Sequence, residues 1–549
     1  MQGRIKHEQI IIKIGVMLGL LWLSALPALS QDLGVIPEPQ AVERTNEFFW
    51  LDESTLLVLG VEAGKHERFA VAEFQDALRN RLNLNLALTY DLAAGNKPNS
   101  IVIGNPEENP KVASRMDLYG LSLTEDVLRE GYVLGIGKHG VVIGAHSSAG
   151  ILYGTITLKQ IIFSRGSAPL PGVKIRDWPF FAMRGIQDEI SYGQVSTMEN
   201  FKDIIRFLAE FKMNTFMIYL EDTFRFEAYP TIGIGRGALT REQVDELEAF
   251  AKPYNVEIIP IFEMLANQGA LLMLDEIRPL AEYPGAHSFA ISEDSYEFFE
   301  NCTRELSAAF DSNYFHAGLD ESWDLGYGRT EELVKQKGKA VVHAEHYRRL
   351  NDMLKRYDKK MMMYSDIVLK YAHILELIPK DIVLMYWKYA PWDRYPEVVQ
   401  HVEKGFELVV LPGMNNWNQF FPTMSAAMIN IKNLTLEAAH YHALGSITST
   451  WGDYGSKNLR ELLYCGYAYQ GEVAWSPQTH DVSDFNRRFF TLRNGPGTSA
   501  YFIAIYELLE KWPVLWHKSL PDYFRHPFLP RKKGHKPTAQ ELYRVYHNA

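Results

Sequence analysis

Apolar residues along the chain follow two patterns, the spacing of a helix face and the continuous run of a buried strand. In the second half of the chain these two patterns alternate regularly. The segment after residue 200 is the clearest helix, because Phe201, Ile204, Ile205, Leu208 and Phe211 share one face. Segments of this kind separate eight short apolar runs that are typical of buried strands. The runs cover residues 181–186, 215–220, 256–262, 314–318, 360–364, 382–387, 406–411 and 443–448. This order predicts an α/β fold, a (β/α)8 TIM barrel.

An open, doubly wound sheet is the alternative that shares this alternation of strands and helices. Such a sheet would be expected to carry a glycine-rich phosphate loop directly after its first strand. Residues 184–188 read Arg-Gly-Ile-Gln-Asp, which lacks that glycine pattern. The barrel is therefore the preferred prediction.

The chain before the barrel predicts a small α+β domain over residues 31–175. It contains strand-like runs, an amphipathic segment at 66–82, a hairpin around Lys138-His-Gly140, and a last helix that Ser147 or Ser148 can cap. A segment with three prolines, 169–179, predicts the boundary with the barrel. We expect the catalytic barrel over 176–485 and a helical extension over 486–549.

The first 30 residues predict a signal peptide. A basic start precedes an apolar stretch, and Ala28-Leu29-Ser30 has the small-x-small form of a cleavage site. We expect cleavage near Ser30/Gln31 and export to the periplasm or the extracellular space, without membrane attachment after cleavage. An uncleaved membrane anchor is the alternative. The net charge of −11 argues against nucleic acid as a partner.

Polar and aromatic side chains follow the predicted barrel strands. Barrel active sites lie at the carboxyl ends of the strands, so these side chains should surround one mouth. Indole rings can stack on sugars, while carboxylates and amides bind hydroxyl groups, so the set predicts a sugar pocket. The main candidates are Arg184, Glu221, Glu263, His316, Asp320, Glu321, Asp366, Trp387, Tyr389, Asn416, Trp417, Trp451 and Asp453.

Metal chemistry is not expected at this mouth. His316 is the only histidine among the strand ends, and catalytic metals usually bind several. The chain has two cysteines, Cys302 and Cys465, too few for a disulfide framework or a Cys-rich metal site. We therefore expect no metal and no cofactor.

Asp320 and Glu321 are neighbours in the chain, and this adjacency restricts the chemistry. Most glycosidases place two carboxyls on either side of the anomeric carbon, roughly 5–9.5 Å apart. Two neighbouring residues at one strand end can hardly do this, so one should act as acid/base while the other has a different task. Substrate assistance, in which a 2-acetamido group attacks its own sugar carbon, is an option that uses such a pair.

The stretch His316-Ala-Gly-Leu-Asp320-Glu321 resembles the H-x-G-x-D-E motif of family 20 glycoside hydrolases, the β-N-acetylhexosaminidases. Asp177-Trp-Pro179 followed by Arg184-Gly185 looks like the entry to the family's first barrel strand, and Trp451-Gly-Asp453 looks like its Trp-Gly-Glu. Residues 130–158 are similar to the domain that precedes the family's barrel, and Trp387 matches the strand-six tryptophan. The resemblance covers about residues 35–480.

This resemblance implies an exo-β-N-acetylhexosaminidase that acts on glycans with terminal GlcNAc or GalNAc and retains the configuration. Glu321 would be the acid/base, and Asp320 would orient the acetamide group. The expected substrate-binding residues are Arg184, His316, Trp387, Tyr389, Asn416, Trp417, Trp451 and Asp453.

The chain departs from the family pattern after three strands, at Glu221-Asp222, Ala266-Asn267 and Asn416-Trp-Asn418, and partly resembles the hexosaminidase D branch. Tyr389, Asn416 and Tyr454 are all candidates to bind the acetamide oxygen. Two other functions stay open. One is a two-carboxylate retaining glycosidase, with Glu221, Asp366 or Asp453 as second acid. The other is a non-catalytic carbohydrate-binding barrel.

Overall fold

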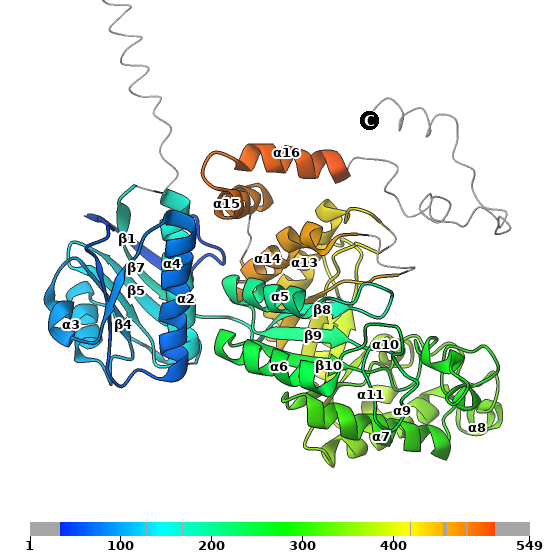
Figure 1. The fold of residues 1–549 in the computed structure, drawn as a ribbon. Helices are drawn as coiled ribbons and strands as arrows, with labels where there is room; N and C mark the ends of the chain where they lie inside the picture. Colours follow the sequence, from blue (N-terminus) through cyan, green and yellow to red (C-terminus); the bar gives the residue numbers. More distant parts are fainter. Residues whose placement is uncertain are drawn as a thin grey trace, which may run out of the picture.

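The computed structural model describes residues 33–510, except 128, 167, 418, 454–457 and 479–480. The predicted signal peptide, Tyr454 and the end of the predicted extension lie outside the described residues. The described chain forms a seven-stranded sheet domain, a closed eight-stranded barrel and two C-terminal helices (Figure 1).

The predicted (β/α)8 barrel is confirmed. Its strands are all parallel, and β15 closes the ring by pairing with β8, from Gly445 opposite Met183 to Ser449 opposite Gln187. Alternate residues point inward, and apolar side chains such as Met217, Ile259 and Met362 fill the interior. The strands are β8 (Met183–Glu189), β9 (Thr215–Tyr219), β10 (Glu257–Ile261), β11 (Tyr314–His316), β12 (Lys360–Tyr364), β13 (Val383–Trp387), β14 (Leu408–Leu411) and β15 (Gly445–Ser449).

Helices surround the barrel and bury their apolar faces on it. The first, α5 (Met198–Glu210), is the amphipathic segment that the spacing predicts, and the Thr197 side chain caps it by accepting a hydrogen bond from the Asn200 backbone N–H. The others are α6 (Arg241–Ala251), α7 (Glu293–Ala309), α8 (Glu331–Lys337), α9 (Lys339–Lys355), α10 (Asp366–Lys370), α11 (Ile374–Leu377), α12 (Glu397–Glu403), α13 (Met424–His440) and α14 (Tyr464–Trp475).

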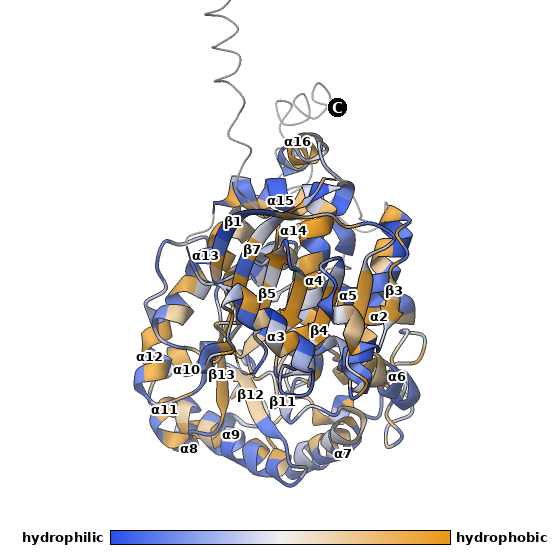
Figure 2. Ribbon diagram, turned by 90° about the vertical axis from the view of Figure 1, so that its left-hand side faces the viewer, coloured by the Kyte–Doolittle hydropathy of each residue, from blue (hydrophilic) through white to orange (hydrophobic). Residues whose placement is uncertain are grey.

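The N-terminal domain is a mixed sheet in the order β1-β7-β5-β6-β4-β2-β3, and its strands are mostly hydrophobic (Figure 2). Helices α2 and α4 lie on the side of the sheet toward the barrel and α3 on the other side (Figure 1). The elements are β1 (Ala41–Phe49), β2 (Leu56–Leu59), α2 (Lys65–Leu82), β3 (Ala87–Thr89), β4 (Ser100–Gly104), α3 (Pro110–Tyr119), β5 (Tyr132–Gly137), β6 (Gly140–Gly144), α4 (Ser148–Arg165) and β7 (Leu170–Asp177).

The proline-containing segment 169–179 is not the linker that its composition predicts. Most of it is strand β7, which pairs with both β1 and β5 inside the sheet. Pro171 sits opposite Phe48, beside an irregularity in the β1 register, which is a place where a strand tolerates a missing N–H. The chain therefore leaves the N-terminal domain only after Asp177.

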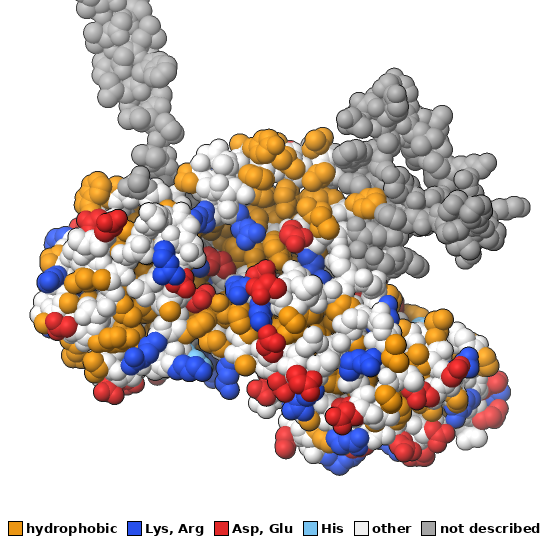
Figure 3. Space-filling model, in the orientation of Figure 1, with side chains coloured by type: hydrophobic (Ala, Val, Ile, Leu, Met, Phe, Trp, Pro, Cys, Tyr) orange, Lys and Arg blue, Asp and Glu red, His pale blue; other side chains and the backbone are white. Residues whose placement is uncertain are grey.

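Two helices follow the barrel, α15 (Val482–Asn494) and α16 (Ser499–Glu510). Arg488 on α15 anchors them by donating to Glu472 of α14, at 2.6 Å, and to the carbonyl of Val35, at 2.7 Å. Hydrophobic side chains gather at the top of Figure 3, where α16 lies. Within the described part of the chain, no helix is both long and apolar enough to span a bilayer.

Candidate active site

The amino end of the barrel faces the N-terminal domain, and it holds Arg184. The sequence pattern ends the first strand at residue 186, but β8 continues to Glu189, so Arg184 is its second residue. Its guanidinium is completely buried and donates to the carbonyls of Lys212 and Phe181, at 3.1 and 2.6 Å, and to the Glu130 carboxylate. The prediction that Arg184 binds sugar is therefore wrong, because it lies at the opposite end from the mouth.

A second buried ion pair joins the two domains at this end. Lys212 Nζ lies 2.7 Å from Asp177 Oδ2, and both side chains are fully buried. The Asp177 carboxylate also accepts hydrogen bonds from Tyr132 Oη at 2.6 Å and from Trp475 Nε1 at 2.7 Å. These two matched pairs fix the N-terminal domain to this end of the barrel and stabilise the fold.

The carboxyl end carries the predicted acid pair on the loop after β11. The backbone of this loop takes left-handed conformations, with φ of 69° at Gly318, 78° at Leu319 and 50° at Glu321. Such strain in residues other than glycine is typical of functional sites. Gly318 is required here for a second reason, since a Cβ atom would lie 1.9 Å from Oε2 of Glu263. The tight loop places Asp320 and Glu321 at the mouth with different surroundings.

Glu263, at the end of β10, is the closest partner of Asp320. Burial and the Asp320 charge raise the pKa of Glu263 well above its ordinary value, so Glu263 holds a proton. The Glu263 Oε2 accepts from the Leu319 N–H at 2.9 Å, and its Oε1 has no hydrogen-bond partner among the described residues, so Oε1 is the oxygen left to carry the proton beside Asp320. Burial also raises the pKa of Asp320, but hydrogen bonds from Glu263 and from Asn267 Nδ2, at 3.1 Å, oppose this effect.

Glu321 is more accessible than its neighbour. Asp320 is 6% exposed, whereas Glu321 is only partly buried. Asp366, at the end of β12, fixes the Glu321 backbone, because its Oδ2 accepts from the Glu321 N–H at 3.1 Å. Burial raises the pKa of Asp366 to about 6. The mouth therefore holds one acid deep and fixed, and the other within reach of a ligand.

His316 supports the acid loop from below. It is the last residue of β11 and is completely buried, and its Nδ1 accepts from the Gly318 N–H at 3.0 Å. Burial lowers its pKa to about 3, so the ring is neutral and its proton is on Nε2, which has no hydrogen-bond partner among the described residues. The Nδ1 side of the ring therefore holds the main chain of the loop, and direct contact of His316 with the sugar stays a prediction.

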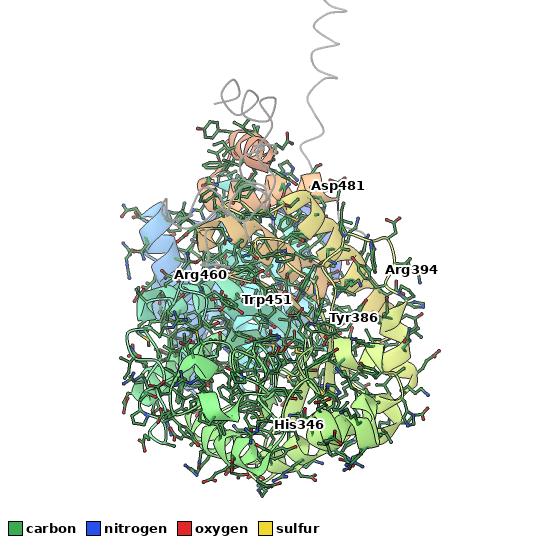
Figure 4. All side chains as sticks on the ribbon, turned by 90° about the vertical axis from the view of Figure 1, so that its right-hand side faces the viewer. His346, Tyr386, Arg394, Trp451, Arg460 and Asp481 are labelled. Atoms are coloured by element: carbon green, nitrogen blue, oxygen red, sulfur yellow. The ribbon has the colours of Figure 1, made fainter. Side chains whose placement is uncertain are left out.

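Aromatic side chains form one wall of the mouth. Trp451 donates from Nε1 to Tyr389 Oη at 2.9 Å, and its ring meets Tyr219 edge-on at 5.3 Å. Tyr389 in turn stacks on Trp387 at 5.3 Å and contacts Trp417 at 4.9 Å. Figure 4 views the molecule from the side away from the N-terminal domain and shows Trp451 near the middle. The four predicted aromatic residues are thus brought together.

Asn416 braces this wall instead of facing a ligand. Its Nδ2 donates to the Trp451 carbonyl at 3.1 Å, and its Oδ1 accepts from the Trp451 N–H at 3.3 Å. The side chain is 2% exposed, so the prediction that it binds substrate is corrected to a role in placing Trp451. Asp453, which lies two residues after Trp451, is partly exposed. Burial and the nearby Glu321 charge raise its pKa.

The mouth also contains charged residues outside the expected substrate-binding set, of which Glu221 was a candidate for a second acid. Glu189 and Glu221, at the ends of β8 and β9, are buried, and burial raises the pKa of each to about 7. Glu189 links two strand ends, because it accepts from the N–H of Gly452 at 2.9 Å. Arg236, flanked by glycines in the loop after β9, pairs with Asp222 at 2.7 Å. Glu189 and Glu221 were visible as strand-end acids, whereas nothing near Arg236 in the sequence pointed to the mouth.

In the part of the chain that the structure describes, no group of three or more His, Cys, Asp or Glu side chains is arranged to hold an ion. Glu263 and Asp366 at the mouth accept backbone N–H groups of the acid loop, and one oxygen of each is buried without a hydrogen-bond partner among the described residues. Acids in such surroundings suit proton transfer and the stabilisation of charge.

Two family models match the chain. "Glycosyl hydrolase family 20, domain 2" matches residues 32–178, and "Glycosyl hydrolase family 20, catalytic domain" matches residues 181–478. The first ends just after β7, and the second begins just before β8.

Curated relatives and solved structures agree with these matches. The chain is 23% identical to a beta-hexosaminidase of Porphyromonas gingivalis over 87% of this chain and 67% of that protein. It is 24% identical to a beta-N-acetylhexosaminidase of Cellulomonas fimi over 57% of this chain and 65% of that protein. The chain thus spans about two thirds of the length of these two relatives. A Vibrio harveyi GH20 exo beta-N-acetylglucosaminidase in complex with N-acetylglucosamine has a TM-score of 0.66 at 18% identity, covering 88% of this chain and 79% of that chain.

Proposed function

This chain belongs to glycosyl hydrolase family 20, and on that premise we propose that it is an exo-β-N-acetylhexosaminidase that releases terminal GlcNAc or GalNAc from glycans. The relatives named beta-hexosaminidase support this activity. The strongest structural support is the unequal environment of two adjacent acids. Asp320 is buried and held by Glu263 and Asn267, while Glu321 is accessible.

The proposed reaction uses the substrate's own acetamide as nucleophile. The acetamide oxygen attacks the anomeric carbon while Glu321 gives its proton to the glycosidic oxygen, and the leaving alcohol departs. Asp320 accepts a hydrogen bond from the acetamide N–H and stabilises the positive charge of the cyclic oxazolinium. Water then attacks the same carbon, Glu321 takes a proton from that water, and the ring reopens. Two inversions give net retention.

The aromatic wall supports the binding of this sugar. Trp451 and Tyr389 present ring faces and edges at the mouth, and sugar C–H groups pack well on such surfaces. Trp387 Nε1 is buried and lacks a hydrogen-bond partner among the described residues, so it can donate to a polar group of the ligand. Asp453, partly exposed and near Glu321, is placed to bind a hydroxyl group.

Hydrolysis of an aryl N-acetyl-β-glucosaminide tests the proposal. Wild-type protein should release the aryl group, and Glu321→Gln should lower kcat/KM by about 10³-fold or more, because the leaving group loses its acid. A substrate with an activated leaving group should recover part of this loss. Asp320→Asn should slow both substrates.

Replacing the 2-acetamido group by hydroxyl is the control for the nucleophile. If the 2-hydroxy glycoside is cleaved as fast as the acetamido glycoside, the reaction uses an enzyme nucleophile and the proposed mechanism is wrong. If neither is cleaved but an N-acetylglucosamine thiazoline binds, the chain is a carbohydrate-binding barrel.

Export is part of the proposal. It rests on the basic, then apolar, then small-x-small order of residues 1–30. Expression of the full chain should give a secreted protein whose first residue is near Gln31. Recovery of the uncleaved chain in the membrane fraction would contradict this.

A further inference from the structure

A second pocket opens beside the acid pair, between the loop after β11 and helices α9 and α10. It has a volume of about 180 Å³. Ser322, which directly follows Glu321, lines it, as does Ile367, which directly follows Asp366. The pocket is therefore next to the proposed acid/base, but it is separate from the aromatic wall of the mouth.

Two lysines give this pocket a positive charge, whereas the mouth is lined by acids. Lys339 Nζ lies 4.7 Å from the centroid of the Tyr327 ring, and Lys370 Nζ lies 4.3 Å from that of Trp323. Neither lysine pairs with a carboxylate among the described residues. After burial, the Lys370 charge is the main influence that lowers the pKa of Lys339, so the two ammonium groups lie within electrostatic range.

Glu282 offsets only part of the positive charge of this pocket. Its charge raises the pKa of Lys339, but it forms no ion pair with either lysine, and its buried carboxylate accepts hydrogen bonds from the backbone N–H groups of Gly326, at 3.2 Å, and Thr330, at 3.1 Å. His343 is also neutral, because burial lowers its pKa to about 4. Two like charges held together repel each other, and a ligand anion would relieve that repulsion.

Exposed aromatic rings complete the pocket. Trp323 is 46% exposed and Tyr327 is 72% exposed, and both line the cavity. Large exposed rings beside polar groups are typical of ligand-binding surfaces. The two ammonium groups lie over these rings, whose faces hold the cations in place without neutralising their charge, so each can still donate to a ligand anion. The combination fits a sugar that carries a negative charge.

The position of the pocket indicates which sugar of the substrate it binds. In the proposed reaction, Glu321 protonates the glycosidic oxygen, so the leaving saccharide must lie beside Glu321. Ser322 and Trp323 are the next residues of the chain and border that side. We infer that this pocket binds the leaving saccharide and selects one that carries a carboxylate or sulfate group. The inference rests on the proposed function.

Three disaccharides that differ in one group test the inference. GlcNAc-β-(1→4)-glucose has a neutral leaving sugar, GlcNAc-β-(1→4)-glucuronic acid places a carboxylate at C6, and GlcNAc-β-(1→4)-glucose 6-sulfate places a sulfate there. The wild-type kcat/KM should favour the acidic substrates by about tenfold, a typical effect of charge pairs at a half-buried site. The preference should fall as salt is added.

Lysine variants show whether the pocket causes this preference. The double variant Lys339→Gln/Lys370→Gln should lose the preference yet keep the wild-type kcat/KM for the neutral disaccharide and for an aryl N-acetyl-β-glucosaminide. Lys335→Gln is the matched control. It removes the same charge from α8, where Lys335 is 58% exposed and pairs with Glu331 and Glu332, and it should keep the preference.

Failure of this inference can be told apart from failure of the proposed function. Turnover of the aryl substrate without preference among the disaccharides would overturn the anionic subsite alone. No turnover of any substrate would overturn both. If inorganic sulfate changes aryl turnover while the disaccharides are cleaved equally, the pocket binds a free anion and the inference is wrong.

Discussion

Both ends of the barrel bury charged side chains, but the two ends treat these charges in opposite ways. At the amino end, Lys212 pairs with Asp177 and Arg184 pairs with Glu130, and each pair is completed by further hydrogen bonds. At the carboxyl end, Asp222 also has an arginine partner, but the carboxyl groups of Glu263, Asp320 and Asp366 lie close together without one, and burial raises their pKa values.

This difference separates charges that stabilise the fold from charges that are available to a ligand. A buried pair with matched partners has its interactions completed before any ligand arrives. Buried carboxyl groups that lie close together have raised pKa values and oxygens without hydrogen-bond partners. Such perturbed groups are typical of functional sites. Mutations that break the pairs at the amino end should therefore lower stability without changing activity. Mutations at the mouth should change activity, and those that remove a buried acid with a raised pKa should also increase stability at neutral pH.

Removing one member of the Lys212–Asp177 pair should have the largest effect on stability. Lys212→Met leaves the Asp177 charge buried without its cation, and the free energy of unfolding should fall by about 3–5 kcal/mol. Activity per folded molecule should not change. Urea denaturation, with kcat measured on the folded fraction, checks both statements.

Lys202→Met is the matched control for this loss. Lys202 pairs with Glu246 at 2.6 Å, but Glu246 is 52% exposed, so the same substitution should cost less than about 1 kcal/mol. If Lys212→Met were as mild as this control, or if it reduced kcat on the folded fraction, the assignment of this end to stability would be wrong.

The buried Glu221 carboxyl should lower the free energy of unfolding at neutral pH and above. Burial raises its pKa to about 7 in the native state, so the folded protein holds this proton more tightly than the unfolded chain. The stability that the protonated Glu221 carboxyl contributes is fully present below the pKa of the unfolded chain. It is lost as the pH rises through 7, where the native carboxyl ionises. Glu221→Gln should match wild type near pH 4 and be more stable at pH 8, on the order of 3 kcal/mol.

Unfolding curves of wild type and Glu221→Gln between pH 4 and pH 8 measure this difference. Glu53→Gln is the control, because Glu53 is an exposed side chain of the N-terminal domain. A constant difference between Glu221→Gln and wild type across this range would mean that the pKa of Glu221 is the same in the native and unfolded states, and that burial does not raise it.

The fold could be predicted from the sequence because the barrel strands are apolar runs. All eight appear in the structure within a few residues of the predicted positions. The exception is instructive. The pattern ended the first strand at residue 186, although β8 continues through Asp188 and Glu189, and both are buried. Because the last residues of this strand are polar, the apolar pattern did not show where the strand ends. Arg184 was consequently assigned to the wrong end of the barrel.

The acid pair could be predicted because its chemistry is local. The left-handed loop after β11 puts Asp320 and Glu321 at the mouth whatever surrounds them. The tasks of His316 and Asn416 could not be predicted in this way. Each makes its hydrogen bonds to main-chain atoms, of Gly318 and of Trp451, and residue type and spacing do not reveal such partners.

Glu263 provides the last test of the comparison, with a smaller effect that falls on activity. Burial and the Asp320 charge raise the pKa of Glu263, which therefore holds a proton beside Asp320, and its Oε2 accepts from the Leu319 N–H. Glu263→Leu removes both contacts, so kcat/KM should fall about tenfold to a hundredfold. The rate should also gain a dependence on Asp320 protonation, visible as a shift of the acidic limb of the pH profile to higher pH, because Asp320 loses a donor that lowers its pKa.

Glu263→Gln distinguishes a shared proton from simple packing. The amide keeps a donor for Asp320 and an acceptor for Leu319, so it reproduces the protonated carboxyl, and activity and pH profile should stay within about threefold of wild type. If Glu263→Gln were as slow as Glu263→Leu, Glu263 would have to act as an ionised carboxylate. The mouth would then contain a second reactive acid, and the adjacency of Asp320 and Glu321 would no longer require the substrate to supply the nucleophile.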